Sequence, residues 1–364
     1  MRDRFGREID YMRISVIDSC NLNCYYCNPQ DNNKKCQAIN TLSVKKVLCI
    51  VRAATRLGIT HFRLTGGEPL LHPQIDEMVS QIKKIPGVRS VSLTTNAVLL
   101  AQHAKQLKEA GIDSINVSLD TIDASEYEHI TKKPLLDKVE HGIDAAIECG
   151  IRVKINVVLT PQTDVVALTR YASKKGTDIR FIEMMPVGEG HINGVEPYEK
   201  VIGTLSELYG EPYHVNTGKT KEINSGYNKY KEERKNPDNG PAEYYSFHGL
   251  DIRVGLIQAI HGKFCDTCNR IRVTADGMLM PCLGSSVTMD LVPDSCEFTD
   301  DLEKDFVIVQ ALKAAIKAKP GCHNFNDNAV TYTKTTETKT VETKTTELKA
   351  AEVNAARNMS RIGG

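Results

Sequence analysis

The chain has no net charge, because its 46 Lys and Arg residues balance its 46 Asp and Glu residues. A protein without a global positive field has no general means of attracting nucleic acid or an anionic membrane surface. We therefore expect no nucleic-acid partner and no membrane partner. An anionic ligand would have to be held by a local cluster of basic side chains.

Long hydrophobic runs are also missing. No apolar stretch approaches the length of a membrane span, and the N-terminal segment, MRDRFGREIDYMRI, lacks the hydrophobic core of a secretion signal. We expect a cytoplasmic protein. With 364 residues, 41% of them hydrophobic, the chain can bury a large core in one domain or two.

Six short runs rich in Val, Ile, Leu and Thr recur with helical stretches between them: MRISVI, HFRLT, SVSLTT, SINVSLD, VKINVVLT and IRFIEMMP. The intervening stretches, such as AQHAKQLKEAG and VEHGIDAAIECG, have helical apolar spacing and end at glycine. This alternation predicts parallel strands crossed by helices. Six units are too few for a closed eight-fold barrel. The predicted fold class is α/β, a partial (βα)6 TIM-like barrel followed by a C-terminal module.

Three cysteines in one segment have the spacing C-x3-C-x2-C: Cys20, Cys24 and Cys27. Three soft thiolates from one loop can hold three irons of a [4Fe–4S] cluster and leave the fourth iron open for chemistry. The alternative is a structural zinc site. Zinc in that role takes four closed ligands, and no fourth ligand is evident nearby in the sequence.

A second set of three cysteines lies in the segment FCDTCNRIRVTADGMLMPCL, at Cys265, Cys268 and Cys282. It predicts a second cluster with an open iron. A zinc ribbon that takes a fourth ligand from His261 or Cys296 remains an alternative. On a strand, Arg270 and Arg272 would project to one face, and guanidinium groups beside an open iron suit a phosphorylated substrate.

The first cysteine motif, with Tyr26 before its last cysteine and GGEP further on, resembles the radical S-adenosylmethionine superfamily. Further motifs narrow the resemblance: YMRIS, RLTGGEPLL, INVSLD, VKIN, RFIEMMP, FC-x2-CNR-x-R with a third cysteine, and a terminal Gly-Gly. Together they closely resemble the GTP 3',8-cyclase (molybdenum cofactor biosynthesis protein A) family, from about Arg4 to His323.

The resemblance implies two [4Fe–4S] clusters and S-adenosylmethionine as cofactors, and GTP as the substrate. A 5'-deoxyadenosyl radical would take the hydrogen from C3' of GTP, and the carbon radical would close onto C8 of guanine. The implied product is (8S)-3',8-cyclo-7,8-dihydroguanosine 5'-triphosphate, a precursor in molybdenum cofactor (molybdopterin) biosynthesis. An electron donor and a downstream pterin synthase are implied partners, with the enzyme a monomer or a homodimer.

The resemblance also assigns residues by matching positions. The expected contacts of S-adenosylmethionine are Tyr26, Gly67, Ser118 and Met185. The expected contacts of GTP are Arg13, Arg63, Thr94, Lys154, Arg270, Ile271 and Arg272, with the base near the second cluster. The terminal Gly363 and Gly364 resemble a family tail that reaches the active site. Independently of the resemblance, this chain of zero net charge has five cations at these positions that suit a triphosphate, and we expect them to converge: Arg13, Arg63, Lys154, Arg270 and Arg272.

We divide the chain into a radical barrel domain with the first cluster (1–235), a C-terminal module with the second cluster (236–330), a low-complexity linker (331–349) and a tail (350–364). Two departures from the family pattern stand out. Ala97 replaces the usual glycine after Thr-Thr-Asn, and the Thr/Lys/Glu linker is long enough to weaken docking of the tail.

Two other hypotheses stay open from the sequence. One is a different radical S-adenosylmethionine enzyme with an auxiliary cluster, acting on a peptide or on haem. The other is a non-catalytic interaction module with two zinc sites. The CNRIR motif and the Gly-Gly end favour the cyclase.

Overall fold

The computed structural model describes residues 1–27, 39–185, 198–214, 240–262, 264–285, 287–291, 301–323 and 351–352. Within these ranges the strands form one sheet in the order β13-β12-β11-β10-β1-β2-β3-β4-β5-β6-β9-β8-β7. The linker at 331–349 and the terminal Gly363 and Gly364 lie outside the described residues.

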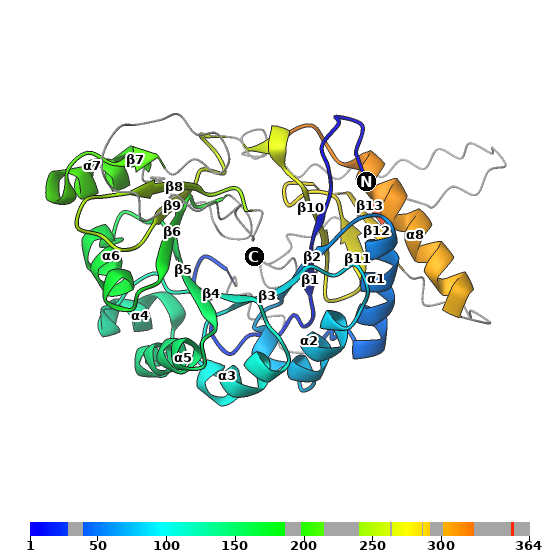
Figure 1. The fold of residues 1–364 in the computed structure, drawn as a ribbon, viewed down its shortest axis with the longest axis horizontal. Coiled ribbons are helices and arrows are strands. Elements are labelled where there is room, and N and C mark those ends of the chain that lie inside the picture. Colours follow the sequence, from blue (N-terminus) through cyan, green and yellow to red (C-terminus); the bar gives the residue numbers. More distant parts are fainter. Residues whose placement is uncertain are drawn as a thin grey trace.

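Six parallel strands form the middle of the sheet: β1 (Tyr11–Ser15), β2 (His61–Thr65), β3 (Ser90–Thr95), β4 (Ser114–Ser118), β5 (Arg152–Val158) and β6 (Asp178–Ile182). They coincide with the six runs predicted from the sequence. The connecting helices are α1 (Val44–Arg56), η2 (Pro69–Leu71), α2 (Ile75–Lys83), α3 (Leu100–Glu109), α4 (Ala124–Thr131), α5 (Leu136–Glu148) and α6 (Val165–Lys174). The strands curve around an open centre with these helices outside (Figure 1), which confirms the partial barrel.

Glycine ends three of the helical stretches as predicted, since Gly58, Gly111 and Gly150 all have positive φ angles. At the other end, Ser43 begins α1 by accepting a hydrogen bond from the Lys46 amide at 3.3 Å. Local capping therefore fixes where the helices start and stop along the barrel.

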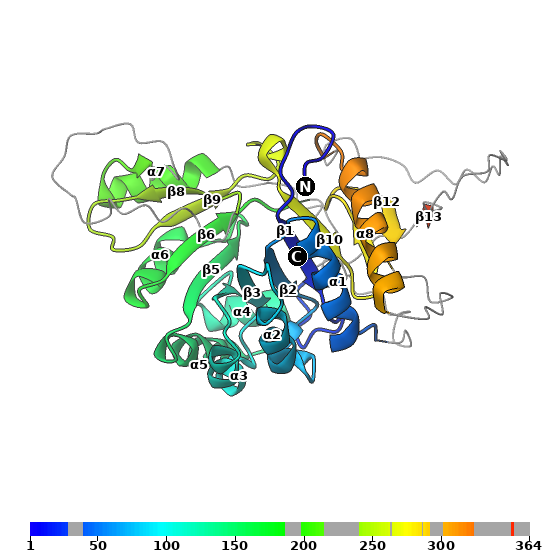
Figure 2. The same ribbon diagram turned by 45° about the vertical axis from the view of Figure 1, so that its right-hand side comes forward.

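Later segments extend the sheet at both edges. Next to β6 lie β9 (Val254–Ile257), β8 (Glu243–Ser246) and β7 (Tyr213–His214), after α7 (Tyr198–Tyr209). Next to β1 lie β10 (Arg270–Val273), β11 (Met278–Met280), β12 (Val287–Asp290) and β13 (Ala351–Glu352). The helix α8 (Asp301–Ala318) lies beside α1 (Figure 2). Residues after 240 thus flank both sides of the barrel, and the domain boundary at 235/236 stays a prediction.

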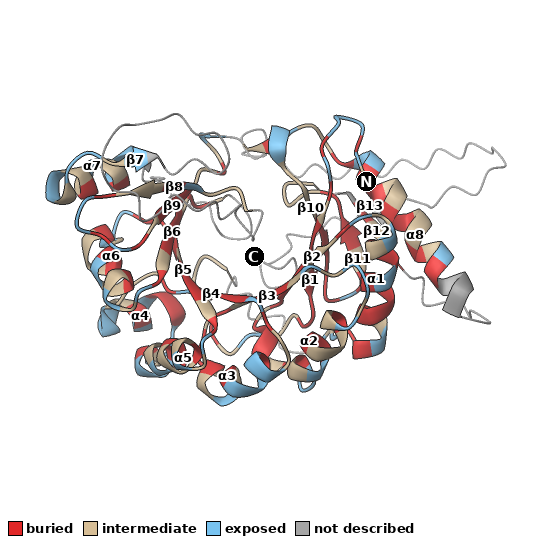
Figure 3. Cartoon of the chain, in the orientation of Figure 1, coloured by how far each residue is buried: buried red, intermediate tan, exposed pale blue. Residues whose placement is uncertain are grey.

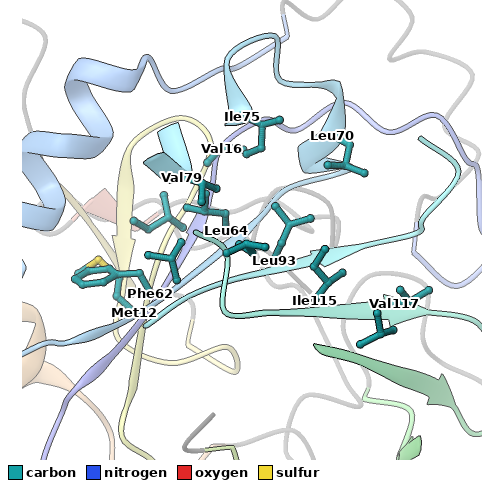
Figure 4. Close-up of a cluster of buried hydrophobic side chains, with 14 of the residues drawn as sticks. Met12, Val16, Phe62, Leu64, Leu70, Ile75, Val79, Leu93, Ile115 and Val117 are labelled. Atoms are coloured by element: carbon teal, nitrogen blue, oxygen red, sulfur yellow. The ribbon is translucent and has the colours of Figure 1, made fainter. Parts of the chain in front are cut away.

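The hydrophobic core lies between the strands and the outer helices. Met12, Phe62 and Leu64 of the strands pack with Ile75 and Val79 of α2 (Figure 4). Buried residues line the strands and the inner sides of the helices, whereas exposed residues cover the outer sides (Figure 3). Each buried side chain of this size contributes about 1.5–3 kcal/mol, so this layer holds the barrel together.

The opposite, concave face of the same strands is polar. Side chains alternate along a strand, so residues between the core positions point to the other face. There the sequence places Arg13, Arg63, Ser92, Asn116 and Lys154, all but Arg13 classed as buried. The interior of a closed eight-fold barrel is filled by branched apolar residues. This concave face is instead lined by polar and charged side chains.

None of the described helices combines the length and the apolar character needed to cross a lipid bilayer.

Candidate active site

The first cysteine set lies in the loop that follows β1, at the carboxyl end of the parallel strands. The Leu22 amide donates a hydrogen bond to Cys20 Sγ at 3.4 Å, and the Cys27 amide donates to the Cys24 carbonyl at 3.0 Å. Burial and the nearby carboxylate of Asp120 raise the pKa of the Cys24 thiol. Binding a metal requires thiolates, so assembly of a cluster here releases protons.

The glycines of the GGEP motif let the loop after β2 pass directly against this cysteine loop. The Gly67 amide donates to the Ile17 carbonyl at 2.8 Å, and the Glu68 amide donates to the Ser19 carbonyl at 2.8 Å. A Cβ atom on Gly67 would lie 2.2 Å from the Ser19 carbonyl oxygen. Only glycine allows this backbone approach, which fixes the chain just before Cys20.

Replacing Gly67 with alanine should therefore displace the cysteine loop. We expect the variant to lose iron from the first set and at least a hundredfold in S-adenosylmethionine cleavage, measured by iron analysis and 5'-deoxyadenosine formation. The matched control is Gly203→Ala in α7, where an added Cβ meets nothing within 4 Å. That control should keep full activity and gain up to about 1 kcal/mol from helix propensity. Normal iron content in Gly67→Ala would contradict this account.

A buried carboxylate joins the GGEP loop to the end of β3. Glu68 Oε1 accepts from the Thr95 hydroxyl at 2.7 Å, and Glu68 Oε2 accepts from the Asn96 amide at 2.8 Å. The Asn96 side-chain amide then donates to Asn21 Oδ1 at 2.7 Å and to Cys20 Sγ at 3.8 Å. The chain turns next at Ala97, which has φ 63°. This left-handed conformation explains the family's preference for glycine and costs alanine about 1–2 kcal/mol.

Burial raises the pKa of Glu68 to about 7, although its hydrogen bonds to Asn96 and Thr95 oppose the shift. The usual pKa of this carboxyl is 4.5, so between pH 4.5 and pH 7 the folded chain holds a proton on Glu68 that the unfolded chain has lost. The free energy of unfolding therefore falls as pH rises through this range. The shift corresponds to about 3 kcal/mol. Denaturant unfolding gives the free energy of unfolding of the native chain and of Glu68→Gln. The difference, native minus variant, should decrease by about 3 kcal/mol between pH 4.5 and pH 8. A difference that does not change with pH would contradict a raised pKa of Glu68.

Tyr26 ties the first cysteine loop to the far side of the barrel. Its hydroxyl donates to Asp120 Oδ2 at 2.5 Å, and Asp120 Oδ1 accepts from the Val158 amide at 2.8 Å. Burial raises the pKa of Asp120. Ser118 ends β4, and Met185 follows β6. The positions expected to contact S-adenosylmethionine therefore lie along one edge of the sheet, at the carboxyl ends of β1, β2, β4 and β6.

Guanidinium groups from three neighbouring strands gather on the concave face. Arg13 lies opposite Arg63 on β2 and opposite Arg272 on β10, and Arg270 is two residues before Arg272. Burial and the charge of Arg272 lower the pKa of Arg13 well below its usual range. Burial and the charge of Arg270 lower the pKa of Arg272 to about 10. These four cations, here called the arginine layer, repel one another and favour an anionic ligand.

Several buried polar atoms near this layer have no hydrogen-bond partner: Arg63 Nε, Arg270 Nε, Thr94 Oγ1 and Asn116 Oδ1. A buried polar atom without a partner costs about 1–3 kcal/mol. Such a group of unsatisfied atoms on one face is expected where a bound ligand completes the bonding. Ile271 differs from its neighbours because its side chain lies in the hydrophobic core. Only its main chain could reach a ligand on the concave face.

The other wall of the concave face carries Lys154 on β5, which lies opposite Asn116 on β4. Next to it Arg180 Nε donates to Asn156 Oδ1 at 2.9 Å, whereas the buried Arg180 Nη2 has no partner. The sequence analysis did not single out Arg180. The alternation of polar and apolar residues in DIRFI could have indicated it, because Arg180 falls between two core residues.

The second cysteine set surrounds the start of β10. Cys265 begins the short helix η4 (Cys265–Thr267), Cys268 precedes β10, and Cys282 follows β11. Burial raises the pKa of Cys268, but the positive charges of Arg270 and Lys319 dominate and lower it to about 7. His261, a possible zinc ligand in the sequence analysis, instead pairs through Nδ1 with Glu183 Oε1 at 2.8 Å. The other possible zinc ligand, Cys296, lies outside the described residues.

The two cysteine sets lie at opposite ends of the concave face. The strand β10 runs parallel to β1, and Cys268 lies two residues before its first residue, whereas Cys20 follows the carboxyl end of β1. A five-residue strand such as β1 spans about 16 Å. The arginine layer extends from Arg270 at the start of β10 to the middle of that span, so one ligand held there can reach toward both sets.

Comparison with known proteins agrees with this geometry. Residues 14–168 match the Radical SAM superfamily, and residues 177–325 match Molybdenum Cofactor Synthesis C. The GTP 3',8-cyclase of Clostridium perfringens (strain SM101 / Type A) is 36% identical over 329 residues, which cover 89% of this chain and 95% of that protein. The chain belongs to the GTP 3',8-cyclase family. The cyclase of Hydrogenovibrio crunogenus is 33% identical over 335 residues, 90% of this chain and 95% of that protein.

Solved structures show the same fold at much lower sequence identity. SuiB of Streptococcus suis with S-adenosylmethionine bound has a TM-score of 0.56 and 15% identity, over 84% of this chain and 66% of SuiB. Native anSMEcpe with bound AdoMet has a TM-score of 0.52 and 17% identity, over 84% of both chains. These likenesses support the partial barrel as a radical S-adenosylmethionine fold.

The residues of this GTP 3',8-cyclase family member fit two [4Fe–4S] clusters. Each set offers three thiols, which is the donor set for a cluster with one open iron. In the described part of the chain, no three His, Cys, Asp or Glu side chains surround one point as the ligands of a single ion would. A cubane binds each thiolate to a different iron, whereas zinc needs its donors around one centre. A structural zinc site takes four ligands and each set offers three thiols, so the donors suit clusters better than two zinc ions.

Proposed function

We propose that this chain is a radical S-adenosylmethionine GTP 3',8-cyclase that acts in the cytoplasm, in molybdenum cofactor biosynthesis. The observation that carries the proposal is the arginine layer, which lies between the two cysteine sets on one concave face. A site for radical chemistry and a site for a polyanion therefore share one wall of the barrel.

At the carboxyl edge, Cys20, Cys24 and Cys27 would hold the first cluster. When bound there, a reduced cluster would supply the electron for cleavage of S-adenosylmethionine to the 5'-deoxyadenosyl radical. The main chain at Gly67 and the side chains of Tyr26, Ser118 and Met185 would hold S-adenosylmethionine against it. The hydrogen bond from Tyr26 to Asp120 supports this role, because it fixes the aromatic ring beside the cysteine loop.

Deeper on the concave face, the arginine layer would bind the triphosphate of GTP. Each guanidinium can form paired, charge-assisted hydrogen bonds with phosphate oxygens. Thr94 and Lys154, with the main chain at Ile271, would complete the contacts, and Cys265, Cys268 and Cys282 would hold the second cluster near the base. The layer would thereby present C3' of the ribose toward the first cysteine set.

The remaining assignments rest on the family. An electron donor must reduce the first cluster, and a downstream pterin synthase would consume the product. The chain would act as a monomer or a homodimer, and Gly363 with Gly364 would reach into the site from the tail. The arginine layer argues against the alternative of a peptide- or haem-modifying enzyme, because neither ligand requires four guanidinium groups. Membership of an enzyme family argues against a silent zinc module.

The direct test is anaerobic incubation of the iron-reconstituted protein with dithionite, S-adenosylmethionine and GTP, followed by mass analysis. We expect both 5'-deoxyadenosine and a cyclised GTP. The cyclised radical must take up one electron and one proton, so this product is an isomer of GTP and is separated from it by chromatography before mass analysis. The matched control replaces GTP with guanosine, which lacks the triphosphate and should not be cyclised. Formation of 5'-deoxyadenosine with GTP left intact would keep the radical chemistry and overturn the proposed substrate.

A further inference from the structure

One buried cation outside the concave face lies against the second cysteine set. Lys319 follows the end of α8, and only 1% of its surface is exposed. Its ammonium donates to the Arg270 carbonyl at 2.8 Å and to the Pro281 carbonyl at 2.9 Å. It also forms a side-chain hydrogen bond with Cys268. Of these three contacts, one is with a cysteine of the set, one is with the residue before Cys282, and one is with the first residue of β10.

The burial of this ammonium calls for a negative partner. Moving a cation out of water costs several kcal/mol unless hydrogen bonds and an opposite charge compensate. Two of the three hydrogen bonds go to neutral carbonyl groups, and only Cys268 can carry a negative charge. An iron–sulfur cluster bound through thiolates supplies that charge at the same place.

A second buried cation nearby shows the contrast. Arg7 donates to the Cys265 carbonyl at 2.7 Å and to the Pro320 carbonyl at 2.6 Å, so it joins the N-terminal segment to the same set. Its charge is already balanced by Asp3, whose carboxylate lies 2.6 Å from Arg7 Nε. Arg7 therefore acts as a structural brace, while the charge of Lys319 is directed at a cysteine sulfur.

We propose that Lys319 is a positioning residue of the second cluster, whose ammonium charge makes that cluster easier to reduce and holds Cys268, Arg270 and Cys282 in register. A cation that donates to a ligating sulfur stabilises the more negative, reduced state of a cluster more than the oxidised state. The same ammonium holds the carbonyl of Arg270, so the cluster and the arginine layer share one support. This role rests on the proposed function, because it requires the second cluster.

The test uses the full-length chain with Cys20, Cys24 and Cys27 replaced by alanine, so that the second cluster alone gives a signal. After anaerobic reconstitution, iron content and the electron paramagnetic resonance spectrum establish the cluster, and a redox titration gives its potential. Lys319→Gln keeps a hydrogen-bond donor but removes the charge. We expect this variant to lower the equilibrium constant for reduction of the cluster at least tenfold, which is a fall of 59 mV in the reduction potential for one electron.

Lys319→Arg restores the charge and should return the potential to that of the parent. Lys317→Gln changes an exposed lysine of α8 and should leave the potential unchanged. An unchanged potential in Lys319→Gln would overturn the proposal, as would an arginine variant that matches the glutamine variant. If Lys319→Gln fails to bind iron, Lys319→Arg decides: a cluster at the parent potential supports the role, and loss of the cluster refutes it. A parent that binds no cluster would instead remove the second cluster from the proposed function, and this role with it.

Discussion

Replacing Cys24 with alanine should abolish cleavage of S-adenosylmethionine, whereas replacing Cys282 should leave uncoupled cleavage intact and stop cyclisation of GTP. The reason is the separation of the two cysteine sets, which lie at opposite ends of the concave face. Loss of one thiolate at the carboxyl edge removes the centre that supplies the electron. Loss of one thiolate in the second set, at the start of β10, removes only the centre expected beside the base. Chromatography followed by mass analysis of 5'-deoxyadenosine and of the nucleotide distinguishes the two effects, because the cyclised nucleotide is an isomer of GTP.

The matched control is Cys149→Ala, which changes a half-buried cysteine at the end of α5, outside both sets. It should retain both reactions and its full iron content, whereas each of the other variants should lose about half of its iron. Cyclisation of GTP at the normal rate by Cys282→Ala would show that the second set has no role with the substrate.

Replacing Arg13 with methionine should weaken binding of GTP far more than it affects cleavage of S-adenosylmethionine. Arg13 lies in the middle of the arginine layer, between Arg63 and Arg272. A charged hydrogen bond to phosphate contributes about 2 kcal/mol, so we expect the KM for GTP to rise about thirtyfold. Steady-state kinetics with GTP varied and S-adenosylmethionine saturating measures this change.

The same substitution should not lower the melting temperature of the ligand-free protein. Burial and the charge of Arg272 both disfavour the charged form of Arg13, so methionine removes a buried charge that its neighbour repels. The control is Arg52→Met on the outer side of α1, which should change neither KM nor 5'-deoxyadenosine formation. An unchanged KM for GTP in Arg13→Met would contradict a triphosphate site in the arginine layer.

The sequence was sufficient to predict the six parallel strands, because each is a short run rich in Val, Ile, Leu and Thr, and stretches with helical apolar spacing separate these runs. The cysteine spacing and GGEP were also readable, since both sets of residues are contiguous in the chain. Their spatial relation was not. The close approach between Gly67 and Ser19 joins two loops that are almost 50 residues apart, and nothing local in either loop indicates it.

The supporting residues were missed for the same reason. Arg180 and Lys319 are ordinary basic residues in the sequence, and their importance comes from burial on a face or against a sulfur. Glu68 was read only as part of a motif, although its carboxylate joins β2 to β3 through Thr95 and Asn96. Ala97 was noticed as a departure from the family, and its positive φ explains why glycine is usual there.

The most direct test of the account follows the hydrogen at C3' of GTP. The reconstituted protein is incubated without oxygen with S-adenosylmethionine and GTP carrying deuterium at C3', and 5'-deoxyadenosine is examined by mass spectrometry. If the arginine layer presents the ribose to the first cysteine set, 5'-deoxyadenosine gains one deuterium and the cyclised nucleotide loses it. Unlabelled 5'-deoxyadenosine beside a nucleotide that keeps its deuterium would contradict the account.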